Sequence, residues 1–346
     1  MAAAVYNMAE IATPAWWAST PAERPDDWRG RLAVAYVRAV IRLLHLFPRQ
    51  DLRAPDYDWS RFRSFMRGVE RVAARLPRET IREPALHFPV SAEWFGDPAH
   101  MAHGGRTLLY VHGGSYVLER TPLHDVLAAE LARTAQARVL AVDYALAPEQ
   151  PFPAGIDDVV ACYRRLMAMG HDPQQIAFVG DSAGAGLALA ALIKLRDNGD
   201  PLPAAYVALS PWADLSFSGA SIIYNAKVDP FMSDIEFVTI CAELYRQGAA
   251  ATHPLVSPAL ADLSGLPPTL IHVGSTDLLI DDARRIVGGI KAAGGKARLD
   301  IWRNMPHVWQ RLAAYVPAAS ASLTAIGQFL RVAIPDRQPA HWDSAA

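Results

Sequence analysis

Residues 176–184 read IAFVGDSAG, and residues 185–194 continue as AGLALAALIK. The first run starts with strand-forming apolar side chains, whereas the second is rich in strong helix formers. A strand that turns sharply into a helix through G-x-S-x-G is a nucleophile elbow, in which the two glycines permit the tight turn. Ser182 is then left at the apex, above the helix N-terminus. The stretch predicts a strand-turn-helix unit that carries a catalytic serine.

The composition is that of a soluble globular protein with ample core material. Of 346 residues, 51% are hydrophobic and 20% are charged, and the formal net charge is −2. This charge gives no sign of a nucleic-acid partner, and no apolar run reaches the ~18 residues that suggest a membrane span. The first ten residues lack the basic start and apolar core of a signal peptide. We therefore expect a cytoplasmic protein without a nucleic-acid partner and without stable membrane insertion.

Neither a metal nor a cofactor is indicated. Cys162 and Cys241 are far apart and in no metal-ligand or redox spacing, so we expect two small buried side chains rather than a disulfide. No spaced set of His, Cys and Glu suggests a catalytic metal. Residues 184–186 read GAG, but the dinucleotide-binding fingerprint is incomplete because Leu189 stands where a glycine or alanine is needed. We expect neither a metal nor a cofactor.

From about residue 85 onward, strand and helix patterns alternate, which predicts an α/β fold with a mostly parallel sheet and right-handed crossovers. The expected strands are residues 86–95, 107–112, 138–143, 176–180, 204–210, 268–274 and 297–302. The expected helices are residues 123–136, 155–169, 182–197, 281–293 and 317–331. Several of these strands are nearly continuous apolar runs, as expected for strands covered on both faces.

Two parts of the chain depart from this alternation. Residues 1–75 hold four tryptophans and two expected helices, at 31–44 and from Trp59 to Leu76, which either cover a core or pocket or bind a membrane surface. Almost sixty residues then separate the strand ending near residue 210 from the next strand, with a helix expected at 234–247. An excursion of this length packs over the ligand end of the sheet or forms an insertion elsewhere.

A serine nucleophile needs a base, and His307 is the best candidate. A serine hydroxyl is a poor nucleophile at neutral pH, so it requires a base, an acid that orients the base, and donors for the oxyanion. His307 follows the last expected strand and precedes the final helix, which is where such a base is needed. His253 lies in the long excursion, and His272 lies within a strand, where a core or interface role is more natural.

The best candidate for the acid is Asp277, which follows the strand 268–274 through a short turn. In strand-helix hydrolases of this type, the chain order is serine, acid, histidine, with each partner on a loop after a strand. Asp281 and Asp282 are alternatives. Both stand where the next helix is expected to begin, and acidic residues there are explained by capping and by the helix dipole.

The oxyanion donors are expected from the amide of Ala183 and from a glycine-rich loop after the strand 107–112. That loop contains Gly113, Gly114 and Ser115, whose backbone is free to turn its N–H groups toward an anion. The alternative is an ordinary turn at a strand end. His112 precedes these residues and more naturally braces the loop than acts as a base.

Several further motifs appear in a specific order: His112-Gly113-Gly114, residues 143–149 (DYALAPE) with 151–154 (PFPA), residues 180–184 (GDSAG), residues 210–214 (SPWAD), residues 257–260 (SPAL) and residues 305–307 (MPH). In this order, over roughly residues 85–331, the chain resembles the bacterial hormone-sensitive-lipase-like esterases (family IV). Two departures are Ser115, where the family often has a further glycine, and Leu278, where the acid motif often has proline.

The resemblance implies an α/β-hydrolase fold with a helical cap. The expected parts are an N-terminal cap region at 1–75, a catalytic domain at 76–214 and 251–335, a cap insertion at 215–250 and a C-terminal tail at 336–346. It also implies a triad of Ser182, Asp277 and His307 and an oxyanion hole of amides from Gly114, Ser115 and Ala183. The resemblance is also compatible with a homodimer.

We therefore expect a serine carboxylesterase that hydrolyses short- to medium-chain acyl esters and loses activity below roughly pH 6.5, where histidine protonates. Alternatives are a lactone or aryl-acetamide hydrolase, or a non-catalytic receptor of the same fold, like the plant gibberellin receptor, which lacks the triad histidine. Candidates for the acyl or alcohol pocket, each equally explained by core packing, are Tyr116, Trp212, Phe231, Met232, Val308 and Trp309.

Overall fold

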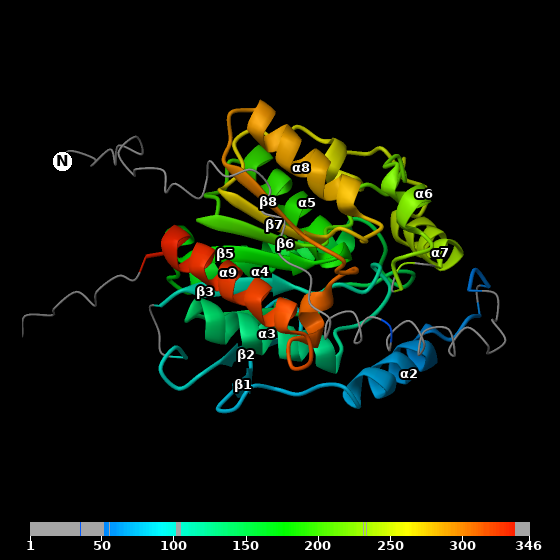
Figure 1. The fold of residues 1–346 in the computed structure, drawn as a ribbon. Coiled ribbons are helices and arrows are strands. Elements are labelled where there is room, and N and C mark those ends of the chain that lie inside the picture. Colours follow the sequence, from blue (N-terminus) through cyan, green and yellow to red (C-terminus); the bar gives the residue numbers. More distant parts are fainter. Residues whose placement is uncertain are drawn as a thin grey trace, which may run out of the picture.

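The computed structural model describes residues 35, 52–54, 56–101, 105–230, 232 and 234–335. These residues form a sheet of eight strands in the order β1-β2-β4-β3-β5-β6-β7-β8 (Figure 1). The strands are β1 Ile81–Pro84, β2 Ala92–Gly96, β3 Thr107–Val111, β4 Arg138–Val142, β5 Ile176–Asp181, β6 Ala205–Leu209, β7 Thr269–Gly274 and β8 Ala297–Trp302. The six strands from β4 to β8 along this order are parallel, whereas β1 and β2 run antiparallel at one edge. The predicted α/β class and mostly parallel sheet are confirmed.

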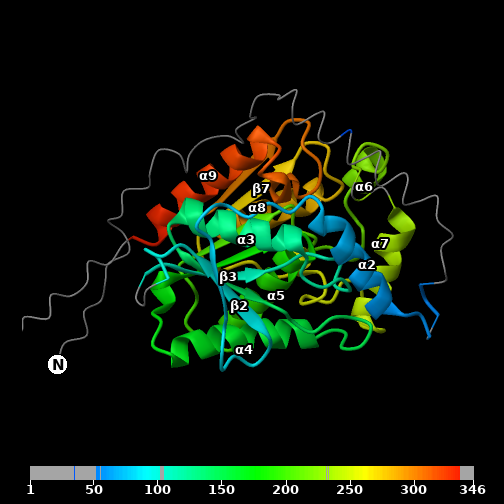
Figure 2. The same ribbon diagram turned by 90° about the horizontal axis from the view of Figure 1, so that it is seen from below.

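Helices cover both faces of the sheet, which explains why its central strands are apolar throughout. The helices that flank the sheet are α3 Pro122–Ala135, α4 Ala154–Ala168, α5 Ala183–Asp197, α8 Ile280–Ala292 and α9 Pro317–Ala333. Figure 2 shows α3 and α9 on one side of the sheet and α4 on the other. The buried side chains form two clusters accordingly, one with α3 and α9 and one with α4, α5 and α8. The helix predictions from residue 123 onward agree with these bounds to within about two residues.

The prediction of a strand at residues 86–95 was wrong for its first half, because β2 begins only at Ala92. The chain instead forms a hairpin, β1 with β2, in which the Ala85 amide donates to the Ala92 carbonyl at 2.9 Å. Pro84 and Pro89 cannot donate to a strand ladder, and His87 adopts a φ of 68°, which extended strands exclude. The sequence pattern therefore placed one strand across a turn.

Three further helices lie together at one end of the sheet: α2 Trp59–Arg71, α6 Ser221–Asn225 and α7 Ile235–Arg246 (Figures 1 and 2). The side chain of Asp234 caps α7 by accepting from the Phe237 amide. Most of the helix expected at 31–44 and the tryptophans before residue 52 lie outside the described residues. The division into cap and catalytic parts stays a prediction.

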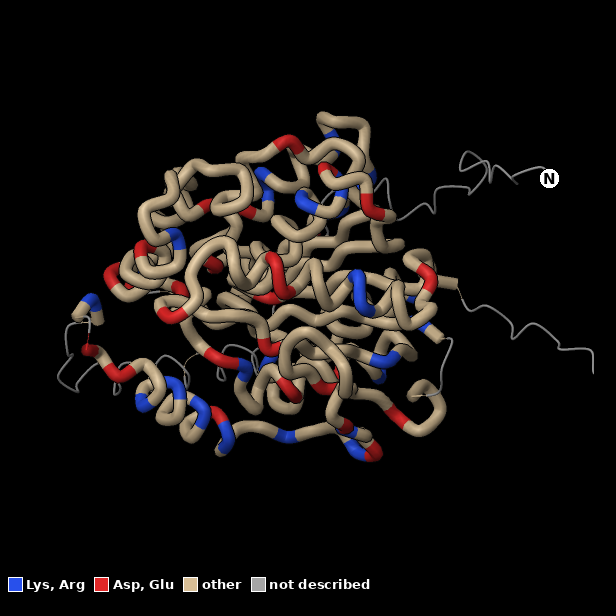
Figure 3. The backbone as a smooth tube through the Cα atoms, turned by 180° about the vertical axis from the view of Figure 1, so that it is seen from behind, with Lys and Arg blue, Asp and Glu red and all other residues tan. Residues whose placement is uncertain are grey.

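Ion pairs attach α2 to the loops of the central sheet. Figure 3 shows several Lys or Arg positions along α2. The Arg63 guanidinium pairs with Glu149 at 2.7 Å and also donates to the Val117 carbonyl at 2.7 Å.

Among the described residues, no helix is both long and apolar enough to cross a bilayer. Cys162 and Cys241 are buried and unpaired, as predicted.

Candidate active site

The turn between β5 and α5 holds Ser182 in a strained backbone conformation. Its φ of 53° and ψ of −125° lie in a region that costs of order 1–3 kcal/mol for a residue with a side chain. Strand β6 and the loop after it maintain this conformation: the Ser182 amide donates to the Leu209 carbonyl at 2.8 Å, and the Ser182 carbonyl accepts from the Trp212 amide at 3.0 Å. The local sequence therefore forms the expected elbow, with the serine at the carboxyl end of the sheet.

The glycines of the elbow permit close contact between strand, loop and helix. A Cβ at Gly184 would lie 2.1 Å from the Val111 carbonyl oxygen, and one at Gly180 would lie 2.7 Å from the Ala185 backbone. Neither position has room for a methyl group, because the atoms that it would meet belong to the backbone. The helix can therefore start directly above the glycine-rich loop.

Gly184→Ala is expected to lower the free energy of unfolding by about 1–3 kcal/mol or more, because overpacking a close-packed site costs this much. Gly288→Ala is the matched control: this exposed glycine of α8 meets nothing within 4 Å of an added Cβ. That control should raise stability by up to about 1 kcal/mol, since alanine favours the helix. Chemical denaturation measures both variants, and an unchanged midpoint for Gly184→Ala would contradict the close approach.

The structure brings Ser182, His307 and Asp277 together in hydrogen-bonding order. The Ser182 hydroxyl lies 2.8 Å from His307 Nε2, and His307 Nδ1 lies 3.2 and 3.3 Å from the two Asp277 carboxylate oxygens. All three side chains are buried. They come from the turns after β5, β7 and β8, because the carboxyl ends of parallel strands meet at one edge of a sheet.

The two alternative acids serve other partners. Asp282 accepts from the amides of Ala213 and Asp214 at 2.8 and 2.9 Å, and burial raises its pKa to about 8. Asp281 accepts from the Ser221 amide at 2.9 Å and pairs with Arg284. The sequence had suggested that both residues cap their own helix. Their carboxylates instead accept hydrogen bonds from neighbouring segments.

The two alternative bases are also engaged elsewhere. His253 is exposed and packs its ring against Phe152, with centroids 5.2 Å apart. His272 is fully buried in β7, with Nδ1 at 2.8 Å from the Ser322 hydroxyl and Nε2 at 3.4 Å from Asp300. His272 therefore belongs to a buried polar cluster away from the elbow.

The charges around His307 favour its protonated form. Burial alone lowers the pKa of an imidazole, but here the Asp277 charge and hydrogen bond, with the charges of Asp229 and Asp181, outweigh burial and raise the pKa of His307 above its ordinary 6.5. An imidazole that receives a proton at this position is thus stabilised. This is the property that a general base beside a serine requires.

The glycine-rich loop lies beside Ser182, and one of its expected donors is already used. The Gly113 amide donates to the Asp181 carboxylate at 2.9 Å, so it is not available for an oxyanion, and we withdraw it from the expected donors. Among the described residues, no partner is found for the amides of Gly114, Ser115 and Ala183. These three amides are free to receive an anion.

Asp181 and His112 brace the loop from beneath. The fully buried Asp181 carboxylate accepts from the Tyr110 hydroxyl at 2.6 Å as well as from Gly113. Burial raises the pKa of Asp181, and the positive charge of Arg311 opposes that shift. His112 Nδ1 donates to the Gly113 carbonyl, and burial lowers the pKa of His112 to about 4, so this ring is neutral at pH 7. The predicted bracing role of His112 agrees with this geometry.

The residues expected to line a substrate pocket lie mainly in the core. Trp309 is fully buried between the sheet and α9, and Trp212 is fully buried on the opposite face. Tyr116 donates to the Trp212 carbonyl at 2.7 Å and stacks on Tyr245, with ring centroids 4.1 Å apart. Val308 and Met232 are also buried, and Phe231 lies outside the described residues. Core packing, the alternative for each, describes Trp212 and Trp309 best.

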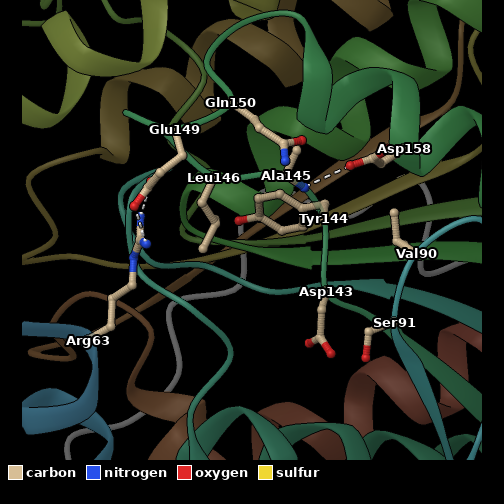
Figure 4. A pocket seen from close by; sticks show the side chains of 10 residues that line it. All are labelled: Arg63, Val90, Ser91, Asp143, Tyr144, Ala145, Leu146, Glu149, Gln150 and Asp158. Carbon is tan, nitrogen blue, oxygen red and sulfur yellow. Dashed lines mark hydrogen bonds and ion pairs between the residues drawn. The ribbon is translucent and has the colours of Figure 1, made fainter. Parts of the chain in front are cut away.

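A surface pocket of about 410 Å³ lies in the loop after β4 and does not include the triad (Figure 4). It is lined by Arg63, Val90, Ser91, Asp143, Tyr144, Ala145, Leu146, Glu149, Gln150 and Asp158. Its polar groups serve one another: Asp158 accepts from the Ala145 amide at 2.8 Å. Tyr144 stacks on His112 with centroids 4.5 Å apart, so the pocket wall supports the glycine-rich loop from outside.

Asp229, which was not among the residues predicted from the sequence, lies beside His307 and Asp277. It is fully buried, and one of its carboxylate oxygens lies within 4.8 Å of both a His307 ring nitrogen and an Asp277 carboxylate oxygen. Asp229 follows α6 in the long excursion and belongs to none of the motifs described above. Its Asp-Pro pair with Pro230 is the only local signal, and that pair alone does not indicate a site.

Residues 108–311 match the model of the alpha/beta hydrolase fold family. The chain is 46% identical, over 70% of its own length and 80% of the relative, to an acetyl-hydrolase of Streptomyces hygroscopicus. It is 36% identical, over 78% of its length and 71% of the relative, to a carboxylesterase/phospholipase of Mycobacterium tuberculosis. The chain belongs to the α/β-hydrolase fold family.

The chain is also similar to solved structures of bacterial esterases. A crystal structure of an esterase from the bacterial hormone-sensitive lipase family superposes with a TM-score of 0.79 at 42% identity, covering 90% of this chain and all of that one. The predicted resemblance to hormone-sensitive-lipase-like esterases is confirmed, and so is the expected class of enzyme, since relatives in both comparisons are named esterases or acetyl-hydrolases.

Proposed function

We propose that this hydrolase is a serine carboxylesterase that uses Ser182 as nucleophile, His307 as base and Asp277 as orienting acid. The observation that carries the proposal is the continuous chain of contacts from the Ser182 hydroxyl through His307 to Asp277, at 2.8 and 3.2 Å. A nucleophile and base within hydrogen-bond reach, with the base oriented by a third group, is the arrangement that covalent acyl transfer requires.

The reaction follows from these contacts. His307 Nε2 takes the Ser182 proton as the serine oxygen attacks the ester carbonyl, and Asp277 stabilises the imidazolium through Nδ1. The amides of Gly114, Ser115 and Ala183 receive the oxyanion; removing one such donor typically costs about 2.7–4 kcal/mol in the transition state. His307 then protonates the leaving alcohol, and the acyl group remains on Ser182. Water hydrolyses this acyl-enzyme with His307 again as base.

Short- to medium-chain acyl esters are the proposed substrates. The similarity to a protein named acetyl-hydrolase supports a small acyl group. A second candidate, hydrolysis of lactones or aryl acetamides, would use the same three residues, because both substrates also pass through a tetrahedral oxyanion. A receptor role is not favoured, since the base that such a protein can lose is present here at hydrogen-bond distance from the serine.

The proposal is tested with p-nitrophenyl esters of two- to twelve-carbon acyl chains, a lactone and an aryl acetamide. Turnover is expected to be highest on the shorter esters and to depend on Ser182. Faster turnover of the lactone or the acetamide would replace the ester as the substrate class. Stoichiometric binding without turnover of any substrate would favour the receptor.

The acid limb of kcat/KM against pH is expected at a pKa above the ordinary 6.5 of histidine, because the carboxylates around His307 raise its pKa. Below that pKa His307 is protonated and cannot accept the Ser182 proton, so kcat/KM should fall about tenfold per pH unit. Initial rates in buffers of constant ionic strength measure this limb. A rate that stays flat down to about pH 4 would exclude a histidine base.

A further inference from the structure

The segment 221–229, made of α6 and the residues after it, is bound to the loop that carries the triad acid. We call residues 275–281 the acid loop. The Ser221 hydroxyl donates to the Leu278 carbonyl at 2.7 Å. The Asn225 side-chain amide donates to the Asp277 carbonyl at 2.8 Å. A segment more than fifty residues earlier in the chain therefore fixes the backbone around Asp277.

Asp229 completes this attachment and also brings a charge to the triad. Its Oδ2 accepts from the Leu278 amide at 3.1 Å, next to Asp277 in the chain. Both aspartates are completely buried, and His307, Asp277 and Asp229 each offer one nitrogen or oxygen atom within 4.8 Å of the other two. Two buried carboxylates thus face one imidazole. At this separation an opposite charge strongly favours the protonated imidazole.

We propose that Asp229 is a positioning residue for the reaction: a second buried carboxylate that stabilises the His307 imidazolium while holding the acid loop through the Leu278 amide. The inference rests on the proposed function, because the imidazolium forms when His307 accepts the proton of Ser182. It adds to the triad a residue from the excursion between β6 and β7, so the docking of the 221–229 segment and the strength of the base are coupled.

A divalent cation is a less suitable occupant of this cluster. Both ring nitrogens of His307 are already engaged, Nδ1 with Asp277 and Nε2 with the Ser182 hydroxyl. A cation bound at either nitrogen would displace one of these contacts. The cluster instead fits a protonated imidazole that lies close to two carboxylates.

The other charges near His307 do not replace Asp229. The carboxylates that raise the pKa of His307 are Asp277, Asp229 and Asp181. Asp181 is committed to Tyr110 and Gly113 on the other side of the elbow, and the positive charge of Arg311 lies close to it. Asp229, unlike Asp181, therefore both lies beside His307 and accepts a hydrogen bond from the acid loop.

Asp229→Asn is the variant that tests this role, because its amide oxygen can still accept from Leu278 while the charge is lost. Its acid limb of kcat/KM is expected to move to lower pH by about one unit, since the pKa of His307 falls. The plateau of kcat should fall about tenfold, which corresponds to the same loss of imidazolium stabilisation. Asp300→Asn is the matched control, because it removes the charge of another buried aspartate, one that pairs with Arg298, and it should leave the acid limb in place.

A second comparison separates charge from structure. Asp229→Glu keeps the negative charge, so its acid limb should lie nearer to that of the wild type than the limb of Asp229→Asn does. An acid limb of Asp229→Asn that coincides with that of the wild type would overturn the inference.

Titration of His307 by NMR, assigned through His307→Gln, separates this inference from the proposed function. If the wild type has no turnover that depends on Ser182, the proposed function fails, but the titration still compares the pKa of His307 in the wild type and in Asp229→Asn. A lower pKa in the variant supports the inference. An unchanged pKa in a variant that melts at the same temperature as the wild type overturns it.

Discussion

Ser182→Ala is expected to lower kcat/KM for a short p-nitrophenyl ester by about 10⁴–10⁶-fold, which is the cost of removing the nucleophile of a serine triad. The loss is this large because the triad acts as a unit: without the hydroxyl, His307 has no proton to take and Asp277 has no imidazolium to stabilise. The remaining rate comes from the oxyanion donors and from binding alone. This residual rate is measured spectrophotometrically from the release of p-nitrophenol. The variant is purified on an unused column, so that no wild-type enzyme contaminates it.

Ser264→Ala is the control for this variant. Ser264 stands on an outer turn, where its hydroxyl donates only to the Asp262 side chain. Its activity should equal that of the wild type. If Ser182→Ala kept more than about one hundredth of the wild-type rate, another nucleophile would have to be sought.

The second large effect is expected from Asp277→Asn, with a loss in kcat of about 10⁴-fold. An asparagine can turn its NH₂ group toward His307 Nδ1 and donate to it. The ring then carries its proton on Nε2, the nitrogen that faces Ser182 at 2.8 Å, and cannot accept the serine proton. The plateau of the pH profile gives the measurement, and a preserved melting temperature shows that the fold is retained.

Asp281→Asn is the matched control for the acid, because it makes the same chemical change four residues further along. Asp281 bonds the Ser221 amide and pairs with the exposed Arg284, so its loss should affect activity by a small factor only. If Asp281→Asn and Asp277→Asn were equally impaired, the acid loop would matter for its structure rather than for one carboxylate.

Local signals in the sequence were sufficient for the elbow and for the positions of the triad. The G-x-S-x-G turn is encoded within nine residues, because two glycines and a change from strand-forming to helix-forming side chains specify it. Asp277 and His307 could be placed because each follows a strand of a parallel sheet, and the ends of such strands converge. The prediction of these two positions thus depended on the topology of the sheet, which the alternation of apolar strands and helices indicates well.

Contacts between distant segments could not be predicted in this way. Asp229 reaches His307 because the α6 segment docks on the acid loop, and no spacing in the sequence encodes that docking. Gly113 resembles an oxyanion donor as closely as Gly114 does, yet the Asp181 carboxylate takes its amide. The hairpin at residues 81–96 was predicted as a single strand at 86–95. The sequence does not show where the partner strand begins, so it did not show that the chain turns near His87.

The measurement that tests the central claim most directly is reaction with a p-nitrophenyl organophosphate, followed by mass spectrometry of the digested protein. Such a compound forms a stable ester with an activated serine, whereas the acyl-enzyme is hydrolysed. We predict release of one equivalent of p-nitrophenol, a single modified peptide with the label on Ser182, and a labelling rate with the same acid limb as kcat/KM. Full esterase activity in protein that remains unlabelled, or a label at another residue, would contradict the account.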